Sequence, residues 1–123
     1  VLCAENRTEW VLSNLAVMAS GAIPVPAYTT NTVNDHSHIL EDSGAKAAIF
    51  SNHKILKNLL PAAEGNKGVK FLVSIEEPSK ITNSKIDIHS WCLFSISWFT
   101  TAMAIIAADS LRKRRGPKFA NST

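Results

Sequence analysis

Short apolar runs recur at an even interval along the first 75 residues of the chain. They occupy residues 1–4, 22–25, 47–50 and 71–75, and their starts are 21, 25 and 24 residues apart. This spacing leaves room for a short strand, a turn and a helix of about three turns, the βαβ unit of a parallel sheet. The pattern predicts a three-layer α/β arrangement, with a mainly parallel sheet of about four strands and right-handed crossovers.

The segment between the first two runs carries the start and end signals of a helix. Asn6 can cap its start, and Glu9, three positions later, can return the capping contact. Gly21 is expected to end it, because glycine adopts the left-handed conformation without a Cβ penalty. Residues at positions i, i+4 and i+7 predict one apolar stripe on this helix: Val11, Leu15 and Met18.

The second apolar run contains two prolines. Pro24 and Pro26 each remove a backbone donor, so this strand is expected to be short or to pair mainly through its carbonyl groups.

Two further helices are predicted downstream. Thr32 with Asp35 can open the first, and Gly44 follows its end. Asn52 precedes the second, which Pro61 is expected to discourage from continuing. The buried positions expected on these helices are Ile39, Leu40, Ile55, Leu56, Leu59 and Leu60.

Composition divides the chain into three parts. Residues 1–75 form the predicted βα scaffold, residues 76–91 a polar and turn-rich connection, and residues 92–123 an atypical apolar and then basic tail. The formal net charge is +3, but residues 1–108 carry eight bases against nine acids. Without a basic field over the body, a nucleic-acid partner is not expected. Cys3 and Cys92 lie far apart and indicate a reduced, cytoplasmic setting.

Few residues suggest chemistry. His36 and His38 are two apart, whereas helical neighbours that could share a metal are three or four apart. Glu76, Glu77 and the Asp87–His89 pair are interpreted as solvated loop groups, and Trp10 as a packing residue. The glycines form neither a dinucleotide-binding nor a P-loop motif. The sequence therefore predicts no catalytic, cofactor-binding or metal-binding residues.

A family resemblance rests on two segments, NRTEWVLSNLAVMASGAIPVPAYT (residues 6–29) and HILEDSGAKAAI (residues 38–49). Both look like the N-terminal region of AMP-forming long-chain fatty acyl-CoA synthetases, members of the adenylate-forming superfamily. The resemblance covers residues 1–75 and extends more loosely to Trp91. It implies that the chain is a partial N-terminal subdomain of the adenylate-forming fold.

The resemblance also implies an activity for the parent enzyme. A fatty-acid carboxylate would attack ATP in the presence of Mg²⁺ to give an acyl-adenylate, and coenzyme A would then displace AMP. In the family, the phosphate loop and the other catalytic motifs follow later in the chain, so this chain by itself is predicted to be inactive. A different interpretation is a small non-catalytic βα binding domain, attached to a membrane through residues 88–108.

The tail permits three interpretations. Residues 88–108 carry no formal charge and precede the cluster Arg112–Arg115, which is the outline of a membrane span with a positive flank. Serines and threonines dilute that stretch, and the positive-inside rule would place the βα body on the side away from ATP. The preferred hypothesis is a truncation, frameshift or read-through product after about Cys92; the others are a membrane or interfacial helix and a divergent soluble helix.

Overall fold

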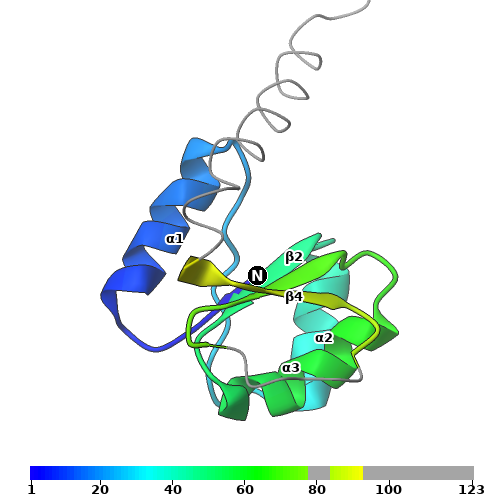
Figure 1. Cartoon of the computed structure of the whole chain (residues 1–123). Coiled ribbons are helices and arrows are strands. Elements are labelled where there is room, and N and C mark those ends of the chain that lie inside the picture. Colours follow the sequence, from blue (N-terminus) through cyan, green and yellow to red (C-terminus); the bar gives the residue numbers. More distant parts are fainter. Residues whose placement is uncertain (78–83, 93–123) are drawn as a thin grey trace, which may run out of the picture.

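The computed structural model describes residues 1–77 and 84–92. Its centre is one parallel four-stranded sheet in the order β1-β2-β3-β4 (Figure 1). The strands are β1 (Leu2–Cys3), β2 (Ala47–Phe50), β3 (Phe71–Ser74) and β4 (Asp87–Ser90). The predicted α/β class with a parallel sheet of four strands is confirmed.

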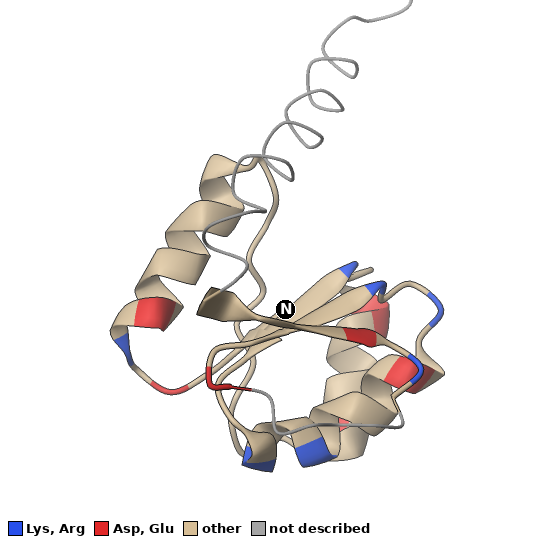
Figure 2. Cartoon of the chain, viewed as in Figure 1, with Lys and Arg blue, Asp and Glu red and all other residues tan. Residues whose placement is uncertain are grey.

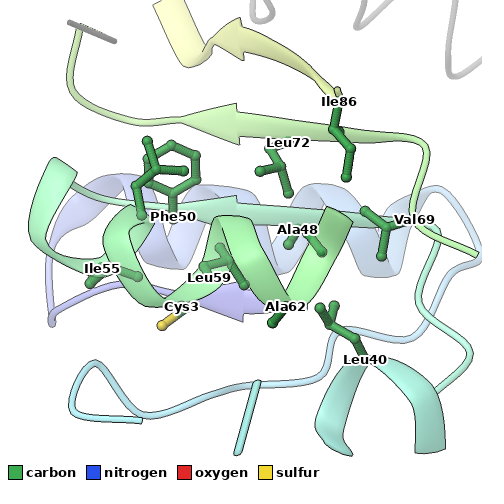
Figure 3. Close-up of a cluster of buried hydrophobic side chains, with 12 residues drawn as sticks. Cys3, Leu40, Ala48, Phe50, Ile55, Leu59, Ala62, Val69, Leu72 and Ile86 are labelled. Atoms are coloured by element: carbon green, nitrogen blue, oxygen red, sulfur yellow. The ribbon is translucent and has the colours of Figure 1, made fainter. Parts of the chain in front are cut away.

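Three helices in the described part of the chain flank the sheet. The helices α2 (Val33–Asp42) and α3 (His53–Gly65) pack against each other along one face. The helix α1 (Thr8–Ala19) lies on the other side of the sheet and meets it at β1 (Figures 1 and 3). The chain therefore has the three layers that the apolar spacing predicts.

The hydrophobic core lies between the sheet and the α2–α3 pair (Figure 3). Phe50 of β2 and Leu72 of β3 face Leu59 of α3, and all three side chains are at most 1% exposed. The predicted residues Leu40, Ile55, Leu56 and Leu59 are buried in this layer. Leu60 packs against it half-buried, whereas Ile39 is half-buried and does not belong to this core cluster. The other core members are Cys3, Leu40, Ala48, Ile55, Leu56, Ala62, Ala63, Val69 and Ile86.

The strand predicted at residues 22–25 is wrong. This segment contributes only an isolated bridge between Pro26 and Leu2. Leu2 donates its N–H to the Val25 carbonyl at 2.9 Å, and Ala27 donates to the Leu2 carbonyl at 2.9 Å. Since Pro24 and Pro26 have no N–H to donate, a longer ladder cannot form, and the expected pairing through a carbonyl is what remains.

The fourth strand comes instead from the end of the predicted polar connection. β4 pairs in register with β3, from Phe71 opposite Asp87 to Ser74 opposite Ser90. The sequence missed this strand because its polar and apolar residues alternate over only four positions, with Ile86 just before it as the buried residue.

The helix termini follow the predicted signals with two exceptions. Gly21 and Gly44 follow α1 and α2 with φ of +79° and +61°, and Thr32 with Asp35 forms a capping box. The capping role expected of Asn6 is wrong: α1 begins one residue later, with Arg7 at the N-cap and no side-chain cap. Pro61 does not stop α3, which continues to Gly65 because Ala62 and Ala63 bury its last turn.

The apolar stripe of α1 differs most from expectation. Val11, Leu15 and Met18 were predicted to form a packing face, yet each is about half exposed in the described structure. Among the described residues, the main contact of α1 with the sheet is with β1, a strand of two residues that is too short to cover a helix of three turns.

The proposed tail lies mostly outside the described residues. Residues 88–90 belong to β4, so a helix over the whole of residues 88–108 is wrong at its start. Within residues 1–77 and 84–92, no helix has the length and apolarity needed to cross a membrane. Of the tail predicted at residues 92–123, Cys92 belongs to the described part, and residues 93–123 lie outside it.

Candidate functional site

The carboxyl ends of the four strands meet at one edge of the sheet. Glu5 closely follows β1, Ser51 and Asn52 follow β2, Glu76 follows β3, and Trp91 follows β4. In open parallel sheets, ligands bind in the crevice beyond this edge, so it is the first place to search for a site. Figure 2 shows acidic residues in the loops that leave the strands here.

Asn52 ties two of these loops together. Its side-chain Oδ1 accepts from the backbone N–H of Ile55 at 3.2 Å and so caps α3. Its Nδ2 donates to Glu5 Oε1 at 2.9 Å. Both polar atoms of the amide are therefore used within the protein.

Glu5 is stabilised as a carboxylate. The pKa of Glu5 is lowered, chiefly by the Ser51 hydroxyl, with a smaller contribution from the Asn52 amide. Among the described residues, buried Ser51 Oγ has no hydrogen-bond partner, so it acts on Glu5 as a nearby dipole. The result is a negative group at the end of β1.

Arg7 is held between two acidic residues. Its Nε donates to Glu9 Oε2 at 3.0 Å, and its Nη1 donates to Glu76 Oε1 at 3.0 Å. The hydrogen bond from Arg7 lowers the pKa of Glu9. These groups are partly exposed, so the pairs add little stability, but they occupy the guanidinium. The edge therefore presents carboxylates rather than a cation that could receive phosphate.

The hydroxyl groups at the edge are also engaged. Ser74 Oγ donates to the Glu76 carbonyl at 2.7 Å, and Ser90 Oγ lies 3.4 Å from Glu77 Oε1. Neither has a histidine partner in these contacts, so the arrangement is that of turn-stabilising serines rather than an activated nucleophile.

Cys3 is equally unsuited to nucleophilic chemistry. Burial, and secondarily the negative charge of Glu5, raises the pKa of the thiol to about 11. Its Sγ contacts the Tyr28 carbonyl at 3.4 Å. A thiol with a raised pKa stays protonated near neutral pH and is inert.

The two histidines weighed as metal ligands do not converge. His36 is buried at 1% exposure, whereas His38 is exposed. Across the described ranges, no group of three or more His, Cys, Asp or Glu side chains could hold a metal ion.

The loop interpretation of Asp87 and His89 is wrong, because both belong to β4. Asp87 is exposed, and the His89 ring meets Phe71 edge-on with centroids 5.9 Å apart. Their alternation with Ile88 places them on the pleat of a strand. Glu76 and Glu77 are exposed, as expected, and Trp10 is half-buried.

A shallow pocket of about 400 Å³ lies between the carboxyl ends of α2 and α3. Glu41 and Lys67 are its charged residues, and the rest of its lining is small or amide-bearing: Ser37, Ala62, Gly65, Asn66 and Gly68. This set offers no array of cations or backbone donors for a nucleotide, and sequence reasoning gave no signal for it.

Comparison with known proteins identifies the family. The sequence model of the AMP-binding enzyme family matches residues 1–109, which is most of the chain. The chain belongs to the AMP-binding enzyme family. The match continues past Trp91, where the resemblance was expected to fade, and reaches Asp109. Searches of curated proteins and of solved structures give no match.

Proposed function

We propose that this AMP-binding family chain is the N-terminal scaffold of an AMP-forming long-chain fatty acyl-CoA synthetase. The observation that carries the proposal is the family match over residues 1–109. The complete polypeptide would join a fatty acid to AMP, with release of pyrophosphate from ATP, and then transfer the acyl group to the thiol of coenzyme A.

The fatty-acid branch of the family is supported by the order of segments in the sequence. Residues 6–29 and 38–49 carry the resemblance to long-chain acyl-CoA synthetases. In the structure these residues form α1, the Pro-containing segment bonded to β1, and α2 with β2. They are packing elements, so they support the fold of the branch more directly than its choice of acid.

The geometry of the sheet edge fits a scaffolding role. Adenylate formation brings a carboxylate against a polyanion, which requires Mg²⁺, lysine and backbone donors preorganised around the phosphates. At the described edge, Arg7 is already paired with Glu9 and Glu76, and Asn52 with Glu5. The described residues therefore do not fit ATP and Mg²⁺, and the parts that bind them would come from the rest of the polypeptide.

The test is adenylate formation by the polypeptide that the native gene encodes around this sequence. Purified protein would be incubated with ATP, Mg²⁺, hydroxylamine and a panel of carboxylic acids, and the hydroxamates counted by mass spectrometry. We expect products with long-chain fatty acids. Products only with amino acids or aryl acids would refute the fatty-acid branch, and no product with any acid would refute the ligase proposal.

A further inference from the structure

The helix α1 is held to the described part of the protein by few contacts. Ser13 is the residue that it buries there, whereas α3 buries a row of apolar side chains from Ile55 to Ala63. The start of α1 has no side-chain cap. An isolated helix of twelve residues is marginal in water, so the stability of α1 depends on the few tertiary contacts that it makes.

Both ends of the segment that contains α1 are anchored at the same strand. Before the helix, the chain leaves β1 at Cys3. After the helix, the Val25 carbonyl accepts from the Leu2 N–H at 2.9 Å, and the Ala27 N–H donates to the Leu2 carbonyl at 2.9 Å. Residues 4–24 are therefore an excursion of the chain that begins and ends at β1 (Figure 1). Detachment of α1 leaves the pairing of β1 with β2 intact.

Polar side chains join α1 to the other strands. Trp91 Nε1, just after β4, donates to Ser13 Oγ at 3.0 Å. Because Ser13 lies on the buried side of α1, this hydrogen bond is broken when the helix moves away from the sheet. At the start of α1, Arg7 pairs with Glu76 beyond the end of β3, but this pair is partly exposed and adds little stability.

We propose that α1 is a detachable element that opens as a unit while the sheet and the α2–α3 layer stay folded, with the Trp91–Ser13 hydrogen bond as its latch. Opening costs little apolar burial, because Val11, Leu15 and Met18 are already about half exposed among the described residues. Its free energy is therefore well below that of global unfolding. The latch sets how often the side of the sheet under α1 becomes accessible. This inference does not depend on the proposed enzyme function.

Amide hydrogen exchange of the full 123-residue chain tests the proposal. It would be followed by NMR under conditions in which the opening equilibrium sets the rate, at several low concentrations of denaturant. We expect the amides of α1 to share one opening free energy and to exchange at least about a hundredfold faster than those of β2 and β3. Denaturant should accelerate them less, because a local opening exposes less surface.

Two outcomes of this measurement would overturn the proposal. Equal protection and equal denaturant dependence in α1 and in the sheet would mean that α1 opens only with the whole molecule. Exchange that quickens steadily from the middle of α1 to its ends would indicate fraying rather than opening as a unit.

The latch is tested by Trp91→Phe, which keeps an aromatic ring and removes the indole N–H. We expect this variant to speed the exchange of α1 about twofold to tenfold and to leave β2 and β3 unchanged. Leu15→Met is the matched control, because Leu15 is 53% exposed and the two residues have similar helix propensities. This control should exchange like the wild type.

A double variant separates the hydrogen bond from the packing of the Trp91 ring. In Ser13→Ala the acceptor is absent, so the addition of Trp91→Phe should speed the exchange of α1 no further. The same acceleration by Trp91→Phe in both backgrounds would contradict the latch, and so would an acceleration of β2 and β3 as large as that of α1.

Discussion

At the scale of single residues, His36 is the buried group with the clearest consequence for stability. Its side chain is 1% exposed, and neither ring nitrogen has a hydrogen-bond partner within residues 1–77 and 84–92. Burial lowers the pKa of His36, with the nearby Asp35 carboxylate acting in the opposite direction. The folded protein therefore holds His36 neutral in a range of pH where the unfolded chain already binds a proton.

The sign of the pH dependence follows from that difference. Because the folded pKa lies below the unfolded value of about 6.5, this contribution to stability is complete above that pH and is lost as the pH falls below it. We expect the free energy of unfolding to decrease by at most about 1.4 kcal/mol per pH unit from this one proton. Urea unfolding of the wild type and of His36→Leu, at several pH values between about 7.5 and 5.5, measures it. A decline as steep in His36→Leu as in the wild type, with exposed His38→Leu as control, would rule out this origin.

Leu59 allows a direct test of the core. It is fully buried between α3 and the sheet, so Leu59→Ala leaves a cavity as well as losing apolar burial. We expect the free energy of unfolding to fall by about 2–5 kcal/mol. Lys57→Ala changes an exposed side chain of the same helix and should stay within about 0.5 kcal/mol of the wild type. Equal denaturant midpoints for the two variants would mean that this core layer is not the one that holds the fold.

At the scale of elements, the start of α2 is fixed by a reciprocal pair of contacts. Asp35 N–H donates to Thr32 Oγ1 at 3.4 Å, and Thr32 N–H donates to Asp35 Oδ2 at 2.9 Å. The hydrogen bonds from Thr32 lower the pKa of Asp35. The capping box therefore requires an ionised Asp35, and the first turn of α2 should begin to fray when that carboxylate is protonated in acid.

Thr32→Ala is expected to destabilise the protein by about 0.5–2 kcal/mol, because it leaves an amide of the first turn without its cap. Amide exchange of the first turn of α2 would locate the effect. The double variant with Asp35→Ala should cost less than the two single variants together, since both disrupt the same pair of contacts. Asn34→Ala, an exposed change in the same turn, is the control. Strict additivity would show that the two contacts are independent.

The elements also show which sequence signals were sufficient. Most signals carried by a few adjacent residues succeeded, as with Thr32 and Asp35, Asn52, and the glycines after α1 and α2. The exceptions are the cap expected of Asn6 and the helix end expected at Pro61. Signals that depend on a partner did not. Residues 22–25 are apolar like a strand, but pairing requires donors that Pro24 and Pro26 lack, and β4 is held mainly by the edge that β3 offers it.

At the scale of the whole molecule, the sequence predicted the sheet and its α2–α3 layer better than the contacts at its carboxyl edge. The pairing of Arg7 with Glu76 joins residues 69 positions apart, and Trp91 with Ser13 joins residues 78 apart. The periodicity of apolar residues in the sequence does not predict such pairs, because they form only when the parallel strands bring their carboxyl ends together. The exposure of Val11, Leu15 and Met18 on α1 is of the same kind, since it depends on what lies over the helix rather than on the helix itself.

From the carboxyl edge of the sheet we predict that this chain alone does not form adenylates. At the described edge the guanidinium of Arg7 is taken by two carboxylates, and Glu5 is held in its charged form. Such an edge repels a triphosphate and offers no preorganised donors for the charge that develops on it. We expect the purified 123-residue chain to show no fatty-acid-dependent exchange of labelled pyrophosphate into ATP above a heat-treated sample. Exchange above that background would mean that residues outside the described part supply a phosphate site of their own, and the scaffold interpretation would be wrong.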